Sequence, residues 1–72
     1  MRTNSQTLGD EFPREIARVE ELRRLYQSLP GGAGKPAAFL MGIDIEKARE
    51  AQIRQDVVEM IKLLPVLQAW EE

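Results

Sequence analysis

Apolar residues recur every three or four positions along most of this chain, which is the spacing of amphipathic α-helices rather than of β-strands. The first stretch predicts a helix over residues 11–29, whose apolar positions are Phe12, Ile16, Val19, Leu22, Leu25, Tyr26 and Leu29. Asp10 is placed to cap this helix, because its carboxylate can accept hydrogen bonds from the first free amides. Residues 1–9 contain one aliphatic side chain, Leu8, so we expect a disordered tail followed by a single helical domain over residues 10–72.

A second helix is predicted over residues 36–53, and it is apolar on two sides. One side carries Met41, Ile45 and Ala48, and the other carries Phe39, Leu40 and Ile43. A helix with two apolar faces packs against two neighbours. Gly42 weakens helix propensity within this segment, so we expect a neighbouring backbone to approach it closely.

The first two helices are separated by a run that no helix crosses, Pro30-Gly31-Gly32-Ala33-Gly34-Lys35-Pro36. Proline lacks a backbone donor and glycine tolerates positive φ, so this run predicts the bend of a helical hairpin. The Gly34-Lys35 pair suggests a phosphate-binding loop, but that motif requires glycine where this chain has Leu29, and serine or threonine where it has Pro36. We therefore assign the run to turning the chain.

A third helix is predicted over residues 56–70, kinked near Pro65, because Asp56 and Glu59 have the spacing of a capping box. Its expected apolar face is Val57, Val58, Met60, Ile61, Leu64 and Leu67. Gln55 is not a helix breaker, however, so one continuous helix from Pro36 to Leu64 is the alternative. The fold class is all-α in either case, as a helical hairpin or a small three-helix bundle.

The small size of the chain points to a partner subunit. A domain of 72 residues buries too little surface for high stability, and such domains often rely on disulfides, a metal or another subunit. The chain has no cysteine and no histidine, so neither a disulfide nor a thiolate or imidazole zinc site is expected. We expect a homodimer held by the second helix and the C-terminal segment.

The candidate interface consists of apolar residues that one partner helix cannot cover, together with one arginine: Phe39, Leu40, Ile43, Leu67, Trp70 and Arg23. Arg23 lies within the apolar stripe of the first helix and has two interpretations. Its methylenes cover the core while its head group reaches water, or it contacts a partner protein. Met41 and Met60 likewise belong to the core or line an adaptable groove.

Charge and composition argue against several function classes. The net charge is −2, from 12 acidic and 10 basic residues that are interleaved, so nucleic-acid binding is not expected. No apolar run approaches the roughly 20 residues that span a bilayer, and the N-terminus lacks a signal peptide's apolar core. We therefore expect a cytoplasmic protein. The carboxylate pairs lie among arginines and lysines on solvated faces, so neither catalysis nor a cofactor is expected.

Three stretches resemble small, mostly uncharacterised helical proteins of bacterial phages and prophages. They are the segment from Phe12 to Leu22, the Gly32-Ala33-Gly34 bend with the alanine-containing helix after it, and Asp56-Val57-Val58-Glu59-Met60-Ile61. Gln55 stands where such proteins have glycine, and Pro65 interrupts the third helix. No catalytic residues come with this resemblance. It implies a phage or prophage setting, in which small helical proteins bind and modulate host proteins, including defence systems, as anti-CRISPR proteins do.

The leading hypothesis is therefore a non-catalytic protein-interaction module that is homo-oligomeric and binds a host protein. A small helix-turn-helix regulator is an alternative, because three short helices can form that motif. A structural or assembly protein of a virion is a second alternative.

Overall fold

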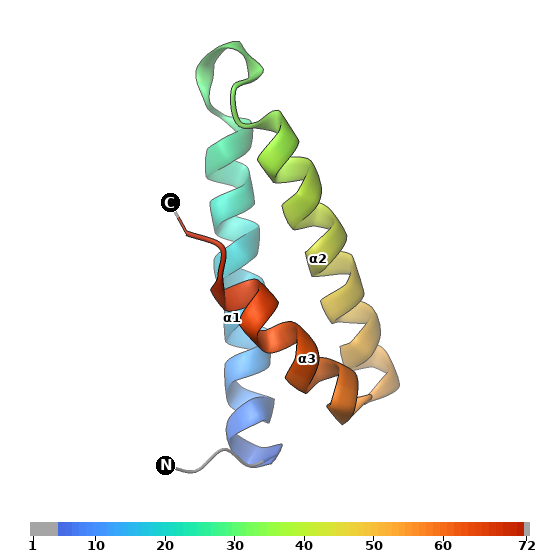
Figure 1. The fold of residues 1–72 in the computed structure, drawn as a ribbon. Helices are drawn as coiled ribbons and strands as arrows, with labels where there is room; N and C mark the ends of the chain where they lie inside the picture. Colours follow the sequence, from blue (N-terminus) through green and yellow to red (C-terminus); the bar gives the residue numbers. More distant parts are fainter. Residues whose placement is uncertain (1–4, 72) are drawn as a thin grey trace.

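The computed structural model describes residues 5–71, with side chains from Leu8 onward, and forms three helices. Helices α1 (Ser5–Gln27) and α2 (Lys35–Arg54) are joined through a short 3-10 turn, η1 (Pro30–Gly32), and α3 (Val57–Gln68) follows. As Figure 1 shows, α1 and α2 form an antiparallel hairpin, and α3 turns back across both. The all-α fold is confirmed, in its three-helix form.

Helix α1 begins earlier than the sequence pattern predicts. It starts at Ser5, and Leu8 is only 5% exposed within the core. Leu8 lies one turn before Phe12, so it extends the apolar stripe and is buried with it. The expectation of a disordered tail is therefore wrong for residues 5–9, and Pro13 lies inside the helix rather than at its start. Residues 1–4 of that tail lie outside the described residues.

The helix also ends earlier than predicted. It stops at Gln27, and Leu29 has extended backbone angles (φ −66°, ψ 142°), as residues before proline prefer. Leu25 and Leu29, expected on the apolar face, are both exposed.

The core is shared by all three helices and excludes charged side chains among the described residues. Phe12, Val19, Met41 and Leu67 are the largest fully buried side chains. Alanines at positions 38, 48 and 51 keep the inner side of α2 narrow, so α2 can contact both neighbours. Met41 and Met60 both belong to this core, which confirms the structural interpretation of the methionines.

The glycine-rich run bends the chain as predicted. Gly31 and Gly32 have φ values of 68° and 73°, in the left-handed region that favours glycine. Gly34 is required for a different reason. A Cβ atom added there would lie 2.1 Å from the backbone oxygen of Tyr26, so only glycine lets α2 begin this close to the end of α1.

The chain breaks between α2 and α3, so the alternative of one continuous helix is wrong. Gln55 adopts the left-handed conformation (φ 55°, ψ 40°) that often ends a helix. Asp56 then caps α3, since its Oδ1 accepts a hydrogen bond from the Glu59 amide at 3.2 Å. Helix α3 continues through Pro65 to Gln68, where the Ala69 amide donates to the Pro65 carbonyl.

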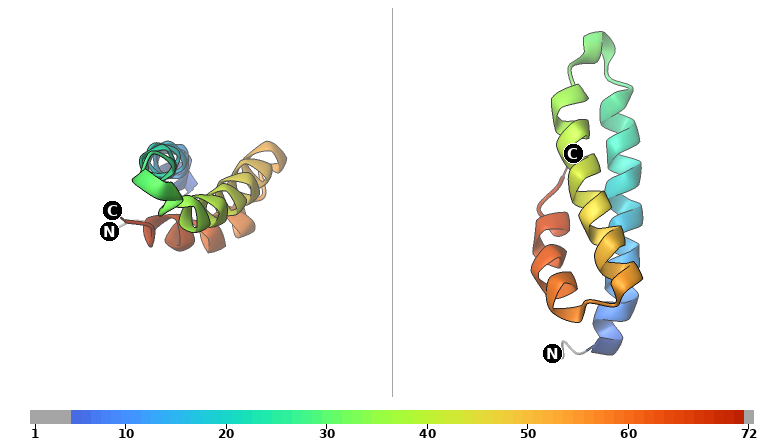
Figure 2. Two further views of the ribbon diagram at one scale, coloured as in Figure 1. Left: turned by 90° about the horizontal axis from the view of Figure 1, so that it is seen from above. Right: turned by 90° about the vertical axis from the view of Figure 1, so that its right-hand side faces the viewer.

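The buried face of α3 differs from the predicted one. Met60, Leu63 and Leu67 are buried, whereas Val57, Val58 and Ile61 are exposed. The helix is apolar around most of its circumference, so periodicity could not decide which side meets the core. Figure 2 shows α3 lying on one side of the hairpin, and the exposed residues are on its outer side.

Candidate interaction surfaces

Two of the candidate interface residues belong to the inside of the chain. Leu67 is fully buried in the core, and Trp70 is half-buried against it. The Trp70 indole Nε1–H donates to Asp44 Oδ2 on α2 at 2.8 Å. The expectation that Leu67 and Trp70 need a second subunit for shelter is therefore wrong, because α1 and α2 already provide it.

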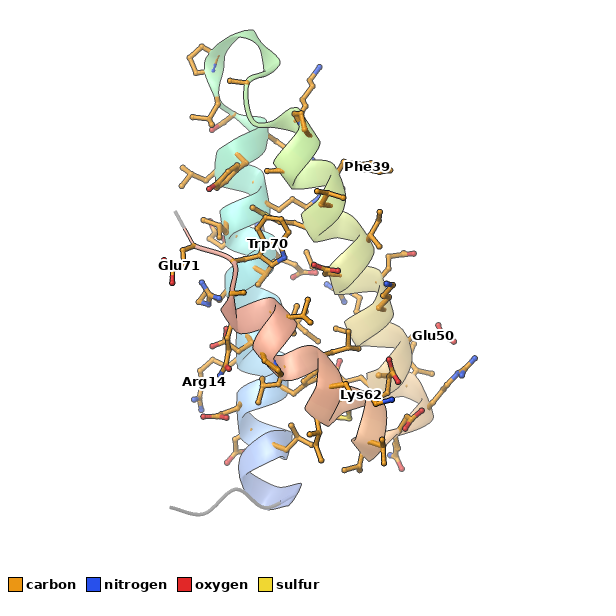
Figure 3. All side chains as sticks on the ribbon, in the orientation of Figure 1. Arg14, Phe39, Glu50, Lys62, Trp70 and Glu71 are labelled. Atoms are coloured by element: carbon orange, nitrogen blue, oxygen red, sulfur yellow. The ribbon has the colours of Figure 1, made fainter. Side chains whose placement is uncertain are left out.

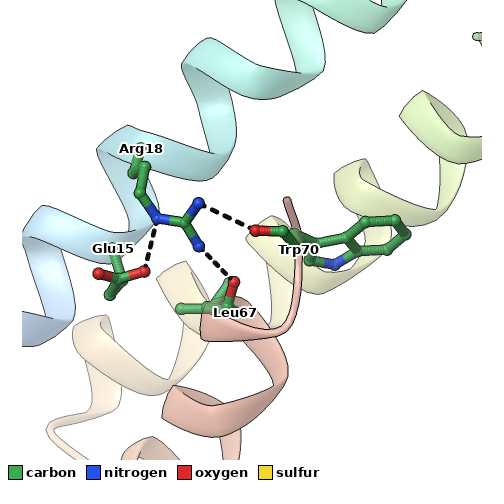
Figure 4. A network of polar contacts seen from close by, with 4 residues as sticks. All are labelled: Glu15, Arg18, Leu67 and Trp70. Atoms are coloured by element: carbon green, nitrogen blue, oxygen red, sulfur yellow. Dashed lines mark hydrogen bonds and ion pairs between the residues drawn. The ribbon is translucent and has the colours of Figure 1, made fainter. Parts of the chain in front are cut away.

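Arg18 holds the C-terminal end of α3, a role that the sequence pattern does not indicate (Figure 4). Its Nη1 and Nη2 groups donate to the carbonyls of Trp70 and Leu67, both at 2.9 Å. Its Nε donates to Glu15 Oε1 at 2.8 Å, which orients the guanidinium. The last carbonyls of a helix lack a partner in the regular helical pattern. Arg18 supplies a donor to the Trp70 carbonyl and a second donor to the Leu67 carbonyl, which also accepts from the Trp70 amide at 3.2 Å.

Tyr26 provides a further link between α1 and the C-terminal segment. Its hydroxyl donates to the Glu71 carbonyl at 2.9 Å. These partners lie more than 40 positions apart in the sequence, so no local signal could have revealed them.

Arg23 acts within the chain in this structure. Its Nε donates to the Ala38 carbonyl on α2 at 3.2 Å, and the side chain is half-buried. A Cβ atom at Gly42 would lie 3.2 Å from the guanidinium carbon of Arg23. Gly42 therefore leaves space for an arginine head group rather than for a neighbouring backbone, which corrects the expectation from the sequence.

The remaining candidate interface residues are exposed on α2. We name Phe39, Leu40 and Ile43 the α2 surface, and Phe39 is 68% exposed. Figure 3 shows the Phe39 side chain pointing outward from α2, away from α1. The α2 surface meets a shallow groove between α1 and α2, where Arg23 and Gly42 lie.

A second apolar surface lies on α3, where the sequence analysis placed core residues. We name Val57, Val58 and Ile61 the α3 ridge; Val58 is 64% exposed and Ile61 56% exposed. Exposed aliphatic side chains grouped on one helix are a common feature of protein contact sites. The signal was present in the sequence, because α3 carries more apolar residues than one buried face requires.

The charged side chains and the helices give little evidence of a further kind of functional site. On α1, Arg18 and Arg24 pair with Glu15 and Glu21, and α3 carries Lys62 as its one basic residue. Across the described residues, no group of three potential ligands could hold a metal ion. None of the helices described here combines the length and apolar content that crossing a membrane requires.

Comparison of the chain with protein-family models, with curated proteins and with solved structures gives no match to any of them.

Proposed function

We propose that this chain is a non-catalytic protein-interaction module. The observation that carries the proposal is a core completed by the chain's own three helices, beside exposed apolar side chains on the α2 surface and the α3 ridge. Fully burying one such valine or isoleucine contributes about 1.5–3 kcal/mol, so a partner that covers several of them gains substantial affinity.

The α3 ridge is the proposed site for another protein. The inner side of α3 is already filled by Met60, Leu63 and Leu67, so Val58 and Ile61 add nothing to the core. Their side chains cost little to order on binding, because branched aliphatic residues have few rotamers. A partner with an apolar groove can therefore bind this helix by its outer face.

The resemblance to phage and prophage proteins supports a bacterial host protein as the partner, which would place the chain in the host cytoplasm. A host defence system is one class of target that such a setting suggests. The virion-assembly alternative uses the same surfaces and is distinguished by finding the chain in purified particles. The DNA-regulator alternative draws no support from α3, whose single lysine and single glutamate give it no basic face.

The experiment is affinity capture from bacterial lysates with the full chain and two variants. Val58→Glu places a charge in the centre of the α3 ridge, at a position already exposed to water. Ala17→Glu is the matched control, because Ala17 is exposed on α1, which contributes no residue to either surface. We expect a stoichiometric protein partner that the wild type and Ala17→Glu retain and Val58→Glu loses. Recovery of no stoichiometric partner, or equal recovery with all three chains, contradicts the proposal.

A further inference from the structure

The first half of α2 carries a self-complementary pattern along one outer line. Lys35, Phe39, Gly42 and Glu46 are separated by four, three and four positions, so they follow one another along one side of the helix. In order, they present a cation, a protruding ring, a position without a side chain and an anion. The pattern is symmetric about the point midway between Phe39 and Gly42. The cation and the anion lie at equal distances along the helix from that point, and so do the ring and the glycine.

The two charged ends of this line have no ion-pair partner among the described side chains. Lys35 and Glu46 are both exposed, and among residues 8–71 neither takes part in an ion pair. Further along α2, Arg49 pairs with Glu20 on α1 and Arg54 pairs with Glu50, whereas Lys47 is in no ion pair among the described residues.

The glycine position is lined by the Arg23 guanidinium, so it offers the protruding ring a flat cationic surface rather than a hollow. Phe39 extends into solvent (Figure 3). Gly42 lies one turn further along, in the groove between α1 and α2. The Arg23 guanidinium lies beside Gly42, and its Nε bond to Ala38 holds it there. An aromatic ring entering the groove would therefore meet a guanidinium, a favourable cation–π contact.

We propose that a second copy of this chain is the occupant of the α2 surface. The two α2 helices pack antiparallel, so that Phe39 lies over Gly42 of the partner subunit and Lys35 lies opposite Glu46 of the partner subunit. The contact is isologous, and a two-fold axis between Leu40 and Met41 generates both halves. This proposal rests on the proposed interaction role and names one partner for it. The dimer leaves the α3 ridge free for a different protein.

The charges select this arrangement over its alternatives. A parallel pair would place Lys35 beside its own copy and Glu46 beside its own copy, and like charges in contact are unfavourable. An antiparallel pair shifted by one turn would separate Phe39 from the glycine and press it against larger side chains. The expected homodimer thus uses α2 alone, since Leu67 and Trp70 are occupied within the chain.

Charge exchange tests this register. Lys35→Glu and Glu46→Lys each place two like-charged pairs in the dimer, so each variant alone should dissociate at concentrations where the wild type is dimeric. A mixture of the two variants restores both attractive pairs and should form a heterodimer, and the double variant should again form a homodimer. Lys47→Glu is the matched control, because Lys47 is exposed but lies off this line. The readout is sedimentation equilibrium, with circular dichroism to verify helix content.

Phe39→Ala tests the apolar centre of the same contact. It removes two rings from each dimer and should raise the dimer dissociation constant by about tenfold or more, as truncation of central aromatic residues commonly does. Ile61→Ala, on the α3 ridge, should leave the constant unchanged. A wild-type chain that sediments as a monomer up to submillimolar concentration would overturn the proposal. A dimer dissociation constant that Phe39→Ala leaves unchanged would also overturn it. So would charge variants that form no heterodimer when they are mixed.

Failure of this dimer is distinguishable from failure of the interaction role. If Val58→Glu abolishes capture of another protein while the wild type is monomeric, the α3 ridge functions and the second-copy proposal is wrong. If the dimer forms as described and no other protein is captured, the second-copy proposal is supported and the proposal that the α3 ridge binds another protein is wrong.

Discussion

The indole of Trp70 and the carboxylate of Asp44 are joined by a 2.8 Å hydrogen bond that attaches the end of the chain to the middle of α2. The ring also packs against the core, so this residue stabilises the position of α3 in two ways. A residue near the end of a small helical chain can therefore be part of its internal structure rather than of an interface.

Trp70→Phe should lower the free energy of unfolding by about 1–2 kcal/mol, because it removes a hydrogen bond to a charged group and part of the ring's contact area. Urea unfolding followed by circular dichroism measures the change. Asp44→Asn is the control, since an amide oxygen still accepts the indole hydrogen, and it should cost clearly less. Equal losses of unfolding free energy in Trp70→Phe and Asp44→Asn would contradict the importance of the hydrogen bond between Trp70 and Asp44.

Arg18→Ala should destabilise the chain by about 1–2 kcal/mol, because it removes the side-chain donor of the Trp70 carbonyl and one of the donors of the Leu67 carbonyl. Arg24→Ala removes an exposed ion pair with Glu21 and should change stability by less than about 0.5 kcal/mol. Thermal unfolding of both variants gives the comparison. Hydrogen exchange should also increase at the end of α3 in Arg18→Ala alone; unchanged exchange there would oppose the assigned role.

Two glycine-to-alanine variants should have opposite effects on stability. Gly34→Ala would bring a methyl group against the Tyr26 carbonyl, so it should destabilise the fold by more than about 2 kcal/mol. Gly9→Ala adds a methyl group in open space inside α1 and should stabilise the chain by about 0.5–1 kcal/mol. The urea concentrations at the unfolding midpoints show whether each variant is more or less stable than the wild type. A Gly34→Ala variant as stable as the wild type would refute the close approach of α1 and α2.

Gln55→Gly should stabilise the chain, because glycine adopts the left-handed conformation at this position without the steric cost that glutamine carries. We expect a gain of about 0.5–1 kcal/mol. Gln52→Gly, inside α2, is the control and should cost a similar amount. Destabilisation by Gln55→Gly would argue for helical geometry at residue 55.

The sequence was most informative where proline, glycine or a capping pair marks a boundary. The predicted second helix, 36–53, differs from α2 by one residue at each end, because Gly34 and the Asp56 cap define its limits. The cap expected at Asp10 misplaced the start of α1, because Asp10 lies inside the helix, which the burial of Leu8 extends into the expected tail.

The candidate site was predicted only in part. Phe39, Leu40 and Ile43 are exposed, as an interface requires, because α2 has more apolar positions than its two neighbours cover. Leu67 and Trp70 were assigned wrongly, since the groups that shelter and bind them come from distant parts of the chain. The α3 ridge was missed because an apolar helix gives no indication of its inner side.

The bonds from Arg18 to the carbonyls of Leu67 and Trp70 span 49 and 52 positions, and this has a consequence for the order of folding. Closing so long a loop from an unfolded chain costs more entropy than closing the short bend between α1 and α2. Once that hairpin exists, however, only a two-residue turn separates α2 from α3. Docking of the C-terminal segment is then a local event, so we expect the hairpin to form first and the contacts of Arg18 to complete the folding reaction.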